Sequence, residues 1–167
     1  MISITGAVSL RFIASSDVTS EFFEKEQDFL YNQKQHLLMD FGQRRKPWVI
    51  KRTELQGQVN LALIGHPYVT DGGSITLTSG IIKEAFIPEG TSSALVNGAI
   101  ESFVASAAFE IDRGIRINAV SPNALVGSWD AYAPSFRGFI PVGDASVFAA
   151  YEKSVFGIMT GQTFKVW

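Results

Sequence analysis

The sequence has 167 residues, of which 46% are hydrophobic, and its net charge is −2. This length and apolar content suit one domain with a hydrophobic core, and the weakly acidic balance argues against nucleic acid as a partner. The absence of cysteine excludes disulfides and thiolate metal sites, as is usual in proteins of the reducing cytoplasm.

Three further features argue against secretion, membrane insertion and metal binding. Residues 1–16 lack the charged start and continuous apolar stretch of a signal peptide. No run in the sequence approaches the roughly 20 apolar residues of a membrane-spanning helix. The two histidines, His36 and His66, do not form a ligand pair at helical spacing. We therefore expect a soluble cytoplasmic protein with neither a metal site nor a membrane partner.

The first half of the chain contains two predicted strands and two predicted helices. Residues 2–5 are an apolar β-branched run that Gly6 closes, which is typical of a buried strand. Mixed but helix-compatible patterns follow over residues 22–39 and again over residues 53–69. Residues 74–78, bounded by glycine-containing turns, are the second predicted strand.

The second half begins with the strongest helix pattern, over residues 91–111. Small and apolar side chains occupy most of its faces, which predicts burial against the sheet and against a second subunit. Residues 115–120 and 163–166 are predicted strands, and residues 144–156 are a predicted helix with Asp144 as its N-cap. Strands that alternate with helices predict an α/β domain, with a parallel sheet of about four strands and flanking helices.

Four motifs between Gly73 and Trp167 resemble segments of the short-chain dehydrogenase/reductase family, in the family's order. The sequence GSITLTS, residues 73–79, resembles the strand that ends in the catalytic serine. The sequence AIESF, residues 99–103, resembles the helix after the Tyr-x-x-x-Lys motif. RGIRINAVSP, residues 113–122, is similar to the signature G-I-R-V-N-x-V-x-P-G, and TGQ, residues 160–162, with Val166 is similar to the closing strand. The resemblance implies a partial Rossmann-type, doubly wound sheet.

Upstream of these motifs the resemblance is weaker. Residues 3–7 resemble a drifted form of the family's N-N-A-G strand end, and residues 55–60 suit the helix before the serine strand. Residues 23–50 match no family segment, so they are an insertion or a replaced region of a single truncated domain, 1–167. Without the family's first strand, residues 2–5 would form an open sheet edge that residues 23–50 or another chain would cover, or the fold would be marginal.

The resemblance assigns the family's four catalytic positions to Ser79, Ser93, Asn97 and Glu54. Ser79 keeps the serine, whereas Ser93 stands at the tyrosine position, Asn97 at the lysine position and Glu54 at the helix asparagine position. A lysine one helical turn after a tyrosine lowers the pKa of the phenol, and Ser93 with Asn97 supplies neither phenol nor cation. We therefore expect the usual Ser-Tyr-Lys proton relay to be lost.

The resemblance also implies NAD or NADP as cofactor, with contacts at Gly6, Pro122 and Asn123. Asn123 replaces the glycine of the family's Pro-Gly turn, and asparagine tolerates the left-handed backbone that such a turn uses. The pyrophosphate-binding loop G-x-x-x-G-x-G occurs nowhere in the sequence. The chain thus resembles an amino-terminally truncated member that starts at the family's fourth strand, or a fragment of a longer reading frame.

Two functions remain open at this stage. One is an atypical NAD(P)-dependent oxidoreductase with a small-molecule substrate, and the other is a non-catalytic remnant that serves as an oligomeric binding or structural module. A hydrolase using Ser79 is disfavoured because the G-x-S-x-G elbow is absent. Under either function the resemblance predicts a homo-oligomer, a dimer, built through helices 53–69 and 91–111.

Overall fold

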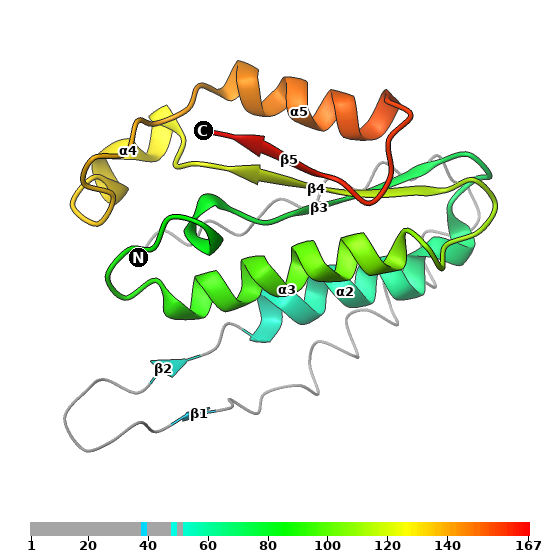
Figure 1. Ribbon diagram of the computed structural model, residues 1–167, viewed down its shortest axis with the longest axis horizontal. Coiled ribbons are helices and arrows are strands. Elements are labelled where there is room, and N and C mark those ends of the chain that lie inside the picture. Colours follow the sequence, from blue (N-terminus) through cyan, green and yellow to red (C-terminus); the bar gives the residue numbers. More distant parts are fainter. Residues whose placement is uncertain (1–37, 40–47, 50–51) are drawn as a thin grey trace.

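The computed structural model describes residues 38–39, 48–49 and 52–167, and residues 52–167 form three layers. A sheet forms the middle layer (Figure 1). Helices α2 (Arg52–Gly65) and α3 (Thr91–Ala107) cover one face, and α5 (Asp144–Phe156) covers the other. The short helix α4 (Trp129–Tyr132) lies beyond the end of the sheet. Helices on both faces of a sheet confirm the predicted α/β class.

The sheet is parallel and has the order β3-β4-β5. Its strands are β3 (Ser74–Thr78), β4 (Arg116–Pro122) and β5 (Thr163–Val166). Two strands have the predicted bounds, whereas β4 starts and ends later than expected because its last two residues pair with Lys165 and Val166 of β5. These three strands confirm a partial Rossmann-type sheet, and the predicted fourth strand, residues 2–5, lies outside the described residues.

Three of the four predicted helices are confirmed, over residues 53–69, 91–111 and 144–156, but the first two are shorter than expected. The helix expected over residues 53–69 ends at Gly65 and continues as a 3₁₀ turn, η1 (His66–Tyr68), which contains Pro67. Proline lacks the amide hydrogen that an α-helix would need there. The helix expected over residues 91–111 ends at Ala107. No helix in the described part of the chain has the length and apolar content needed to cross a bilayer.

Asp144 does not have the capping role that its sequence position suggests. The N-cap of α5 is Gly143, and no side chain caps the helix. Asp144 is instead the first helical residue, where its carboxylate interacts favourably with the positive end of the helix dipole.

Residues 38–39 show that the predicted helix over residues 22–39 is wrong at its end. These two residues form β1 (Leu38–Met39), which pairs antiparallel with β2 (Trp48–Val49). A backbone that pairs with another strand cannot also make the i to i−4 bonds of a helix. The rest of that helix, and most of the segment 23–50, lie outside the described residues.

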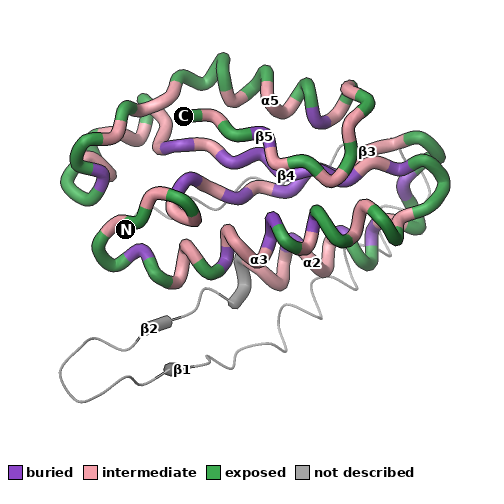
Figure 2. The backbone as a smooth tube through the Cα atoms, in the orientation of Figure 1, coloured by how far each residue is buried: buried purple, intermediate pink, exposed green. Residues whose placement is uncertain are grey.

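The apolar core lies between the sheet and α3. Figure 2 shows the buried residues concentrated along the strands and on the inner side of α3. Eight of its side chains are at most 2% exposed: Ala62, Ile75, Leu77, Val96, Ile100, Val104, Ile117 and Ala119. Alternation along β3 directs its apolar residues to this face and its threonines to the other.

The opposite face of β3 meets α5 through paired hydroxyl groups. Thr76 Oγ1 lies 2.7 Å from Ser154 Oγ, and Thr78 Oγ1 lies 2.5 Å from the Tyr151 hydroxyl. Burial raises the pKa of the Tyr151 phenol, and the hydrogen bond with Thr78 opposes that rise. These bonds fix the position of α5 on the sheet, because a buried hydroxyl without its partner would be costly.

Candidate functional site

A cavity of about 240 Å³ lies at the carboxyl ends of β3 and β4. Its walls come from α2, the end of β3, the 3₁₀ turn η2 (Ile81–Lys83), the first half of α3, the loop after β4, and α4. In open α/β sheets, the crevice outside the carboxyl ends of the strands is where ligands bind. The lining residues are Gln58, Thr78, Ser79, Gly80, Ile81, Ile82, Ser93, Val96, Asn97, Ile100, Pro122, Asn123, Ala124, Leu125, Tyr132 and Phe136.

Five of the seven residues that the sequence predicted for the site line this one cavity. They are Ser79, Ser93, Asn97, Pro122 and Asn123. Their positions span 44 residues of sequence, from position 79 to position 123, and the parallel pairing of β3 with β4 brings them together. The side chain of Glu54, on α2, and the whole of Gly6 lie outside the described residues. The catalytic and cofactor-binding roles of all seven remain predictions.

Ser79 is buried at the end of β3, and its hydroxyl donates a 2.8 Å hydrogen bond to Glu101 Oε1. Glu101 comes from the middle of α3 and is only 8% exposed. Its second oxygen, Oε2, accepts a 2.6 Å hydrogen bond from Lys83 Nζ on η2. A buried carboxylate therefore connects the cavity serine to a lysine, which stabilises the charge that burial would otherwise disfavour.

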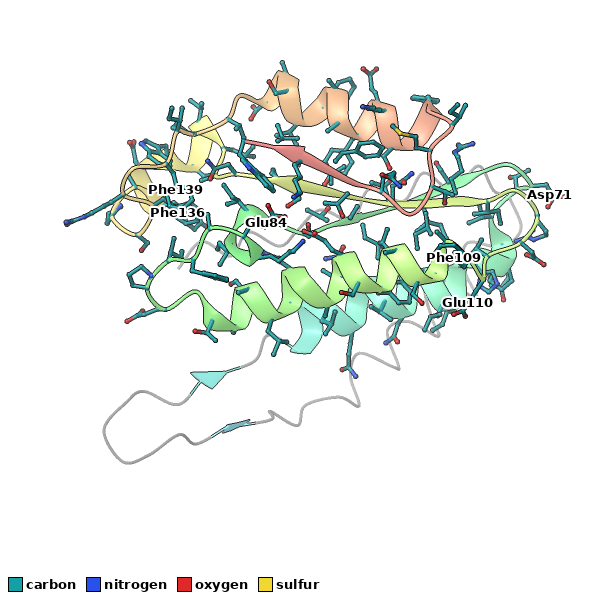
Figure 3. All side chains as sticks on the ribbon, viewed as in Figure 1. Asp71, Glu84, Phe109, Glu110, Phe136 and Phe139 are labelled. Carbon is teal, nitrogen blue, oxygen red and sulfur yellow. The ribbon has the colours of Figure 1, made fainter. Side chains whose placement is uncertain are left out.

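The ion pairs continue from Lys83 toward the surface. Lys83 Nζ lies 3.3 Å from Glu84 Oε1, and the same carboxylate oxygen accepts a bond from Lys165 on β5. The hydrogen bond to Glu101 raises the pKa of Lys83, and the Lys165 ammonium lowers the pKa of Glu84. Figure 3 shows Glu84 on the short turn after β3. The four charged groups alternate in sign in the order Glu101, Lys83, Glu84 and Lys165, so each lies beside a group of opposite charge.

Asn97 joins α3 to the turn that follows β3. Its Nδ2 donates to the backbone oxygen of Gly80 at 3.1 Å. A Cβ atom at position 80 would lie 3.1 Å from the same nitrogen, so any side chain there would crowd this contact. Asn97, which the sequence predicts at the family's lysine position, thus makes a structural hydrogen bond. Ser93 stands one helical turn earlier and lines the cavity without a cation beside it.

Asn123 stabilises the loop after β4 by a different means from the one expected. Its backbone is not left-handed, since the positive-φ residues other than glycine in the described chain are Glu89 and Arg113. Its Nδ2 instead donates to the Ile140 carbonyl at 2.8 Å, and its Oδ1 accepts from the Ala124 amide at 2.7 Å. The left-handed turn inferred for Asn123 is therefore wrong, and the side chain holds the loop by hydrogen bonds.

Gln58 of α2 also lines the cavity, although no sequence pattern pointed to it. Its Nε2 donates to the Thr78 carbonyl at 2.9 Å, and its Oε1 accepts from the Thr78 amide at 2.7 Å. These are the two backbone groups that β3 turns away from β4, so Gln58 takes the place of a neighbouring strand there. The pairing is invisible in sequence because 20 residues separate the two positions.

Aromatic side chains from α4 and the turn after it close the far wall of the cavity. The Tyr132 and Phe136 rings meet edge to face with centroids 6.0 Å apart, and Phe136 meets Phe139 in the same way at 5.2 Å. Figure 3 shows Phe136 and Phe139 beside each other near α4, at the opposite end of the sheet from Asp71. The i, i+4 spacing of Tyr132 and Phe136 is the one sequence signal that would have identified this wall.

The cavity is neutral. Among the described residues, no aspartate, glutamate, lysine, arginine or histidine lines it. Within the described ranges, no three or more histidine, aspartate or glutamate side chains gather in a group that could hold a metal ion. The lining instead combines apolar side chains with three amides, three hydroxyls of serine and threonine, and the Tyr132 phenol. Such a surface suits an uncharged ligand with one or two polar groups.

Comparison with known proteins agrees with this geometry. Residues 48–164 match the family model described as enoyl-(acyl carrier protein) reductase. The crystal structure of the protein lin1944 from Listeria innocua is 53% identical, covers 66% of this chain and 56% of its own, and superposes with a TM-score of 0.66. No curated protein matches the sequence.

Two further crystal structures are described as small-chain dehydrogenases. One is 31% identical with a TM-score of 0.54 and covers 67% of this chain and 52% of its own. The other, a complex with NADPH, is 32% identical with a TM-score of 0.53 and covers 66% of this chain and 56% of its own. The chain therefore spans slightly more than half the length of these relatives. It belongs to the short-chain dehydrogenase/reductase family.

Proposed function

We propose that this chain forms the substrate side of an NAD(P)-dependent oxidoreductase that acts on a small neutral molecule. The observation that carries the proposal is the cavity at the carboxyl ends of β3 and β4, where Ser79, Ser93 and Asn97 converge. A relative of 32% identity is described as a complex with NADPH, which supports the cofactor class. The uncharged lining supports a neutral substrate.

The residues of this chain fit only one end of the cofactor. NAD(P), when bound, supplies a hydride donor or acceptor, and its nicotinamide is a flat group with one polar carboxamide. The amides and apolar side chains of the cavity suit such a group. The phosphates need cations or a glycine-rich backbone turn, but the lining has no cation and the sequence has no G-x-x-x-G-x-G. We therefore assign the cavity to the nicotinamide and substrate ends alone.

A binding module without turnover is the second candidate. The observation in its favour is the pair Ser93 and Asn97, which provides neither a phenol nor an ammonium group at the family's proton-transfer positions. A serine hydroxyl is a far weaker acid at neutral pH than a phenol beside a cation. Tyr132 is the one phenol among the described lining residues, and none of those residues is a lysine, arginine or histidine.

A larger side chain in the cavity should weaken cofactor binding. We expect NADPH or NADH to bind the wild-type protein and the Ser93→Phe variant to bind at least about tenfold more weakly, because the larger ring occupies the space that the ligand needs. Isothermal titration calorimetry measures both affinities. The matched control is Ser146→Phe, the same change at an exposed position of α5 on the other side of the sheet.

Two results would contradict the oxidoreductase proposal. Absence of binding by either cofactor to the wild-type protein would leave only the module, and equal affinity of both variants would place any cofactor outside the cavity. Consumption of NADPH with an added ketone then separates the two candidates. Turnover favours the enzyme, and binding without turnover favours the module.

Self-association through α2 and α3 is part of the proposal. The two helices lie side by side on one face of the sheet and carry exposed apolar side chains, among them Leu63 of α2, which is 55% exposed, and Leu95 of α3, which is 45% exposed. Burial of such a surface between two copies would remove it from water. We expect Leu63→Glu to convert dimers to monomers in sedimentation velocity. Phe148→Glu, at an exposed position of α5, should leave the dimer intact. Unchanged sedimentation of the Leu63 variant would place the contact elsewhere.

A further inference from the structure

The Ser79 hydroxyl has one hydrogen, and it donates that hydrogen in a hydrogen bond to Glu101. A hydroxyl can donate once and accept twice, whereas a carboxylate in an ion pair only accepts. The 2.8 Å bond from Ser79 Oγ to Glu101 Oε1 therefore leaves the serine oxygen with acceptor capacity alone. A hydrogen bond from a hydroxyl to an ionised carboxylate is also a strong one, so a neutral ligand competes poorly for that hydrogen.

Lys83 prevents the carboxylate from turning away. Its ammonium donates to Oε2 of Glu101 at 2.6 Å, while Oε1 faces the serine. Glu101 is only 8% exposed, so little water is present to replace either bond. The carboxylate is thus held at both oxygens, and Ser79 cannot regain a free hydrogen without breaking a buried ion pair.

The cavity amides each use one of their two N–H groups within the protein. Each of the three amide side chains already donates to a backbone carbonyl: Gln58 to Thr78, Asn97 to Gly80 and Asn123 to Ile140. A ligand carbonyl needs a donor, which the second N–H of these amides and the hydroxyls of Ser93 and Tyr132 can supply elsewhere in the cavity, but which Ser79 cannot. A ligand hydroxyl or amine needs an acceptor, and Ser79 Oγ is one.

From these contacts we propose that Glu101 is a positioning residue that makes Ser79 Oγ a hydrogen-bond acceptor, so that the position beside Ser79 selects a ligand hydroxyl or amine over a ligand carbonyl. The inference rests on the proposed function only in that a small neutral molecule binds in the cavity. The inference adds that the ligand group beside Ser79 donates a hydrogen bond. In the direction of an oxidoreductase, it favours recognition of the alcohol over the ketone.

A matched pair of probes tests this selection. Cyclohexanol and cyclohexanone have nearly the same shape and differ in whether they donate a hydrogen bond. We expect the wild-type protein to bind the alcohol about 3- to 10-fold more tightly, as one gained hydrogen bond allows. Ligand-observed NMR titration measures both affinities. In Glu101→Gln the amide can donate to Ser79, which frees the serine hydrogen, so the preference should fall to unity or reverse.

The control is Glu84→Gln, which neutralises the other carboxylate beside Lys83 but leaves the contact between Ser79 and Glu101 in place. It should keep the preference for the alcohol. If Glu101→Gln does not fold, Ser79→Ala gives the same test, because loss of the acceptor should weaken alcohol binding and leave ketone binding unchanged.

The outcomes separate the inference from the proposed function. Equal binding of the two probes by the wild-type protein, or tighter binding of the ketone, would overturn the inference while small-molecule binding stands. Retention of the alcohol preference in both Glu101→Gln and Ser79→Ala would overturn it as well. If neither probe binds the wild-type protein, the cavity assignment itself fails, and the proposed function falls with the inference.

Discussion

Replacement of Leu77 by alanine should lower the free energy of unfolding by about 2–5 kcal/mol. Leu77 lies in the middle of β3, is fully buried and belongs to the cluster that joins the sheet to α3. Removal of three carbon atoms there sacrifices their transfer free energy and leaves a void that the strand and helix can only partly close. The loss is a large fraction of the roughly 5–15 kcal/mol that stabilises a domain.

Equilibrium urea unfolding measures this change, which should appear as a lower midpoint at an unchanged slope. Leu95→Ala is the matched control on α3, because the Leu95 side chain is 45% exposed and loses less burial. Its cost should stay below about 1 kcal/mol. Equal midpoints for the two variants would mean that the core does not lie between β3 and α3.

Replacement of Asn118 by alanine should lower the free energy of unfolding by about 2–4 kcal/mol, because two backbone groups lose their partner. Asn118 is fully buried on β4. Its Nδ2 donates to the Met159 carbonyl at 2.8 Å, and its Oδ1 accepts from the backbone amide of Gln162 at 3.0 Å. One side chain therefore holds the loop that leads into β5.

Hydrogen exchange distinguishes this effect from loss of the core. The backbone amide hydrogen of Gln162 should exchange faster in Asn118→Ala under native conditions, since its acceptor has gone and β5 opens locally. Gln162→Ala is the control, because it removes an exposed side chain that donates only to Thr160. It should change the free energy of unfolding by less than about 0.5 kcal/mol. Native-like exchange at Gln162 in the Asn118 variant would contradict this role.

The elements of residues 52–167 were largely predictable because their hydrophobic periodicity is strong. The bounds of β3, β5 and α5 agree with the sequence pattern. Predictions failed where a neighbour decides the structure. The pairing with β5 carries β4 through Pro122, and the pairing of β1 with β2 overrides a helical pattern at Leu38–Met39. Neither pairing is encoded in local spacing.

The site was predictable only in part, for the same physical reason. Motif resemblance selected Ser79, Ser93 and Asn97, and the fold brings them to one cavity. Glu101 lies within one of the quoted motifs, yet its contact with Ser79 spans 22 residues and depends on how α3 packs against β3. Lys83 is 18 residues from its partner and lies on a turn that no periodic pattern marks. Contacts of this kind follow from the tertiary structure alone.

The pairing of Gln58 with Thr78 limits how the sheet can grow. Of the residues in β3, Ser74, Thr76 and Thr78 turn their backbone groups toward the edge opposite β4, since Ile75 and Leu77 alternate with them. The Gln58 amide already occupies both groups of Thr78. A strand added along this edge would hydrogen-bond as far as Thr76 and no farther. The cavity lining at Ser79 would then stay clear of any added strand, so sheet extension and ligand binding there do not compete.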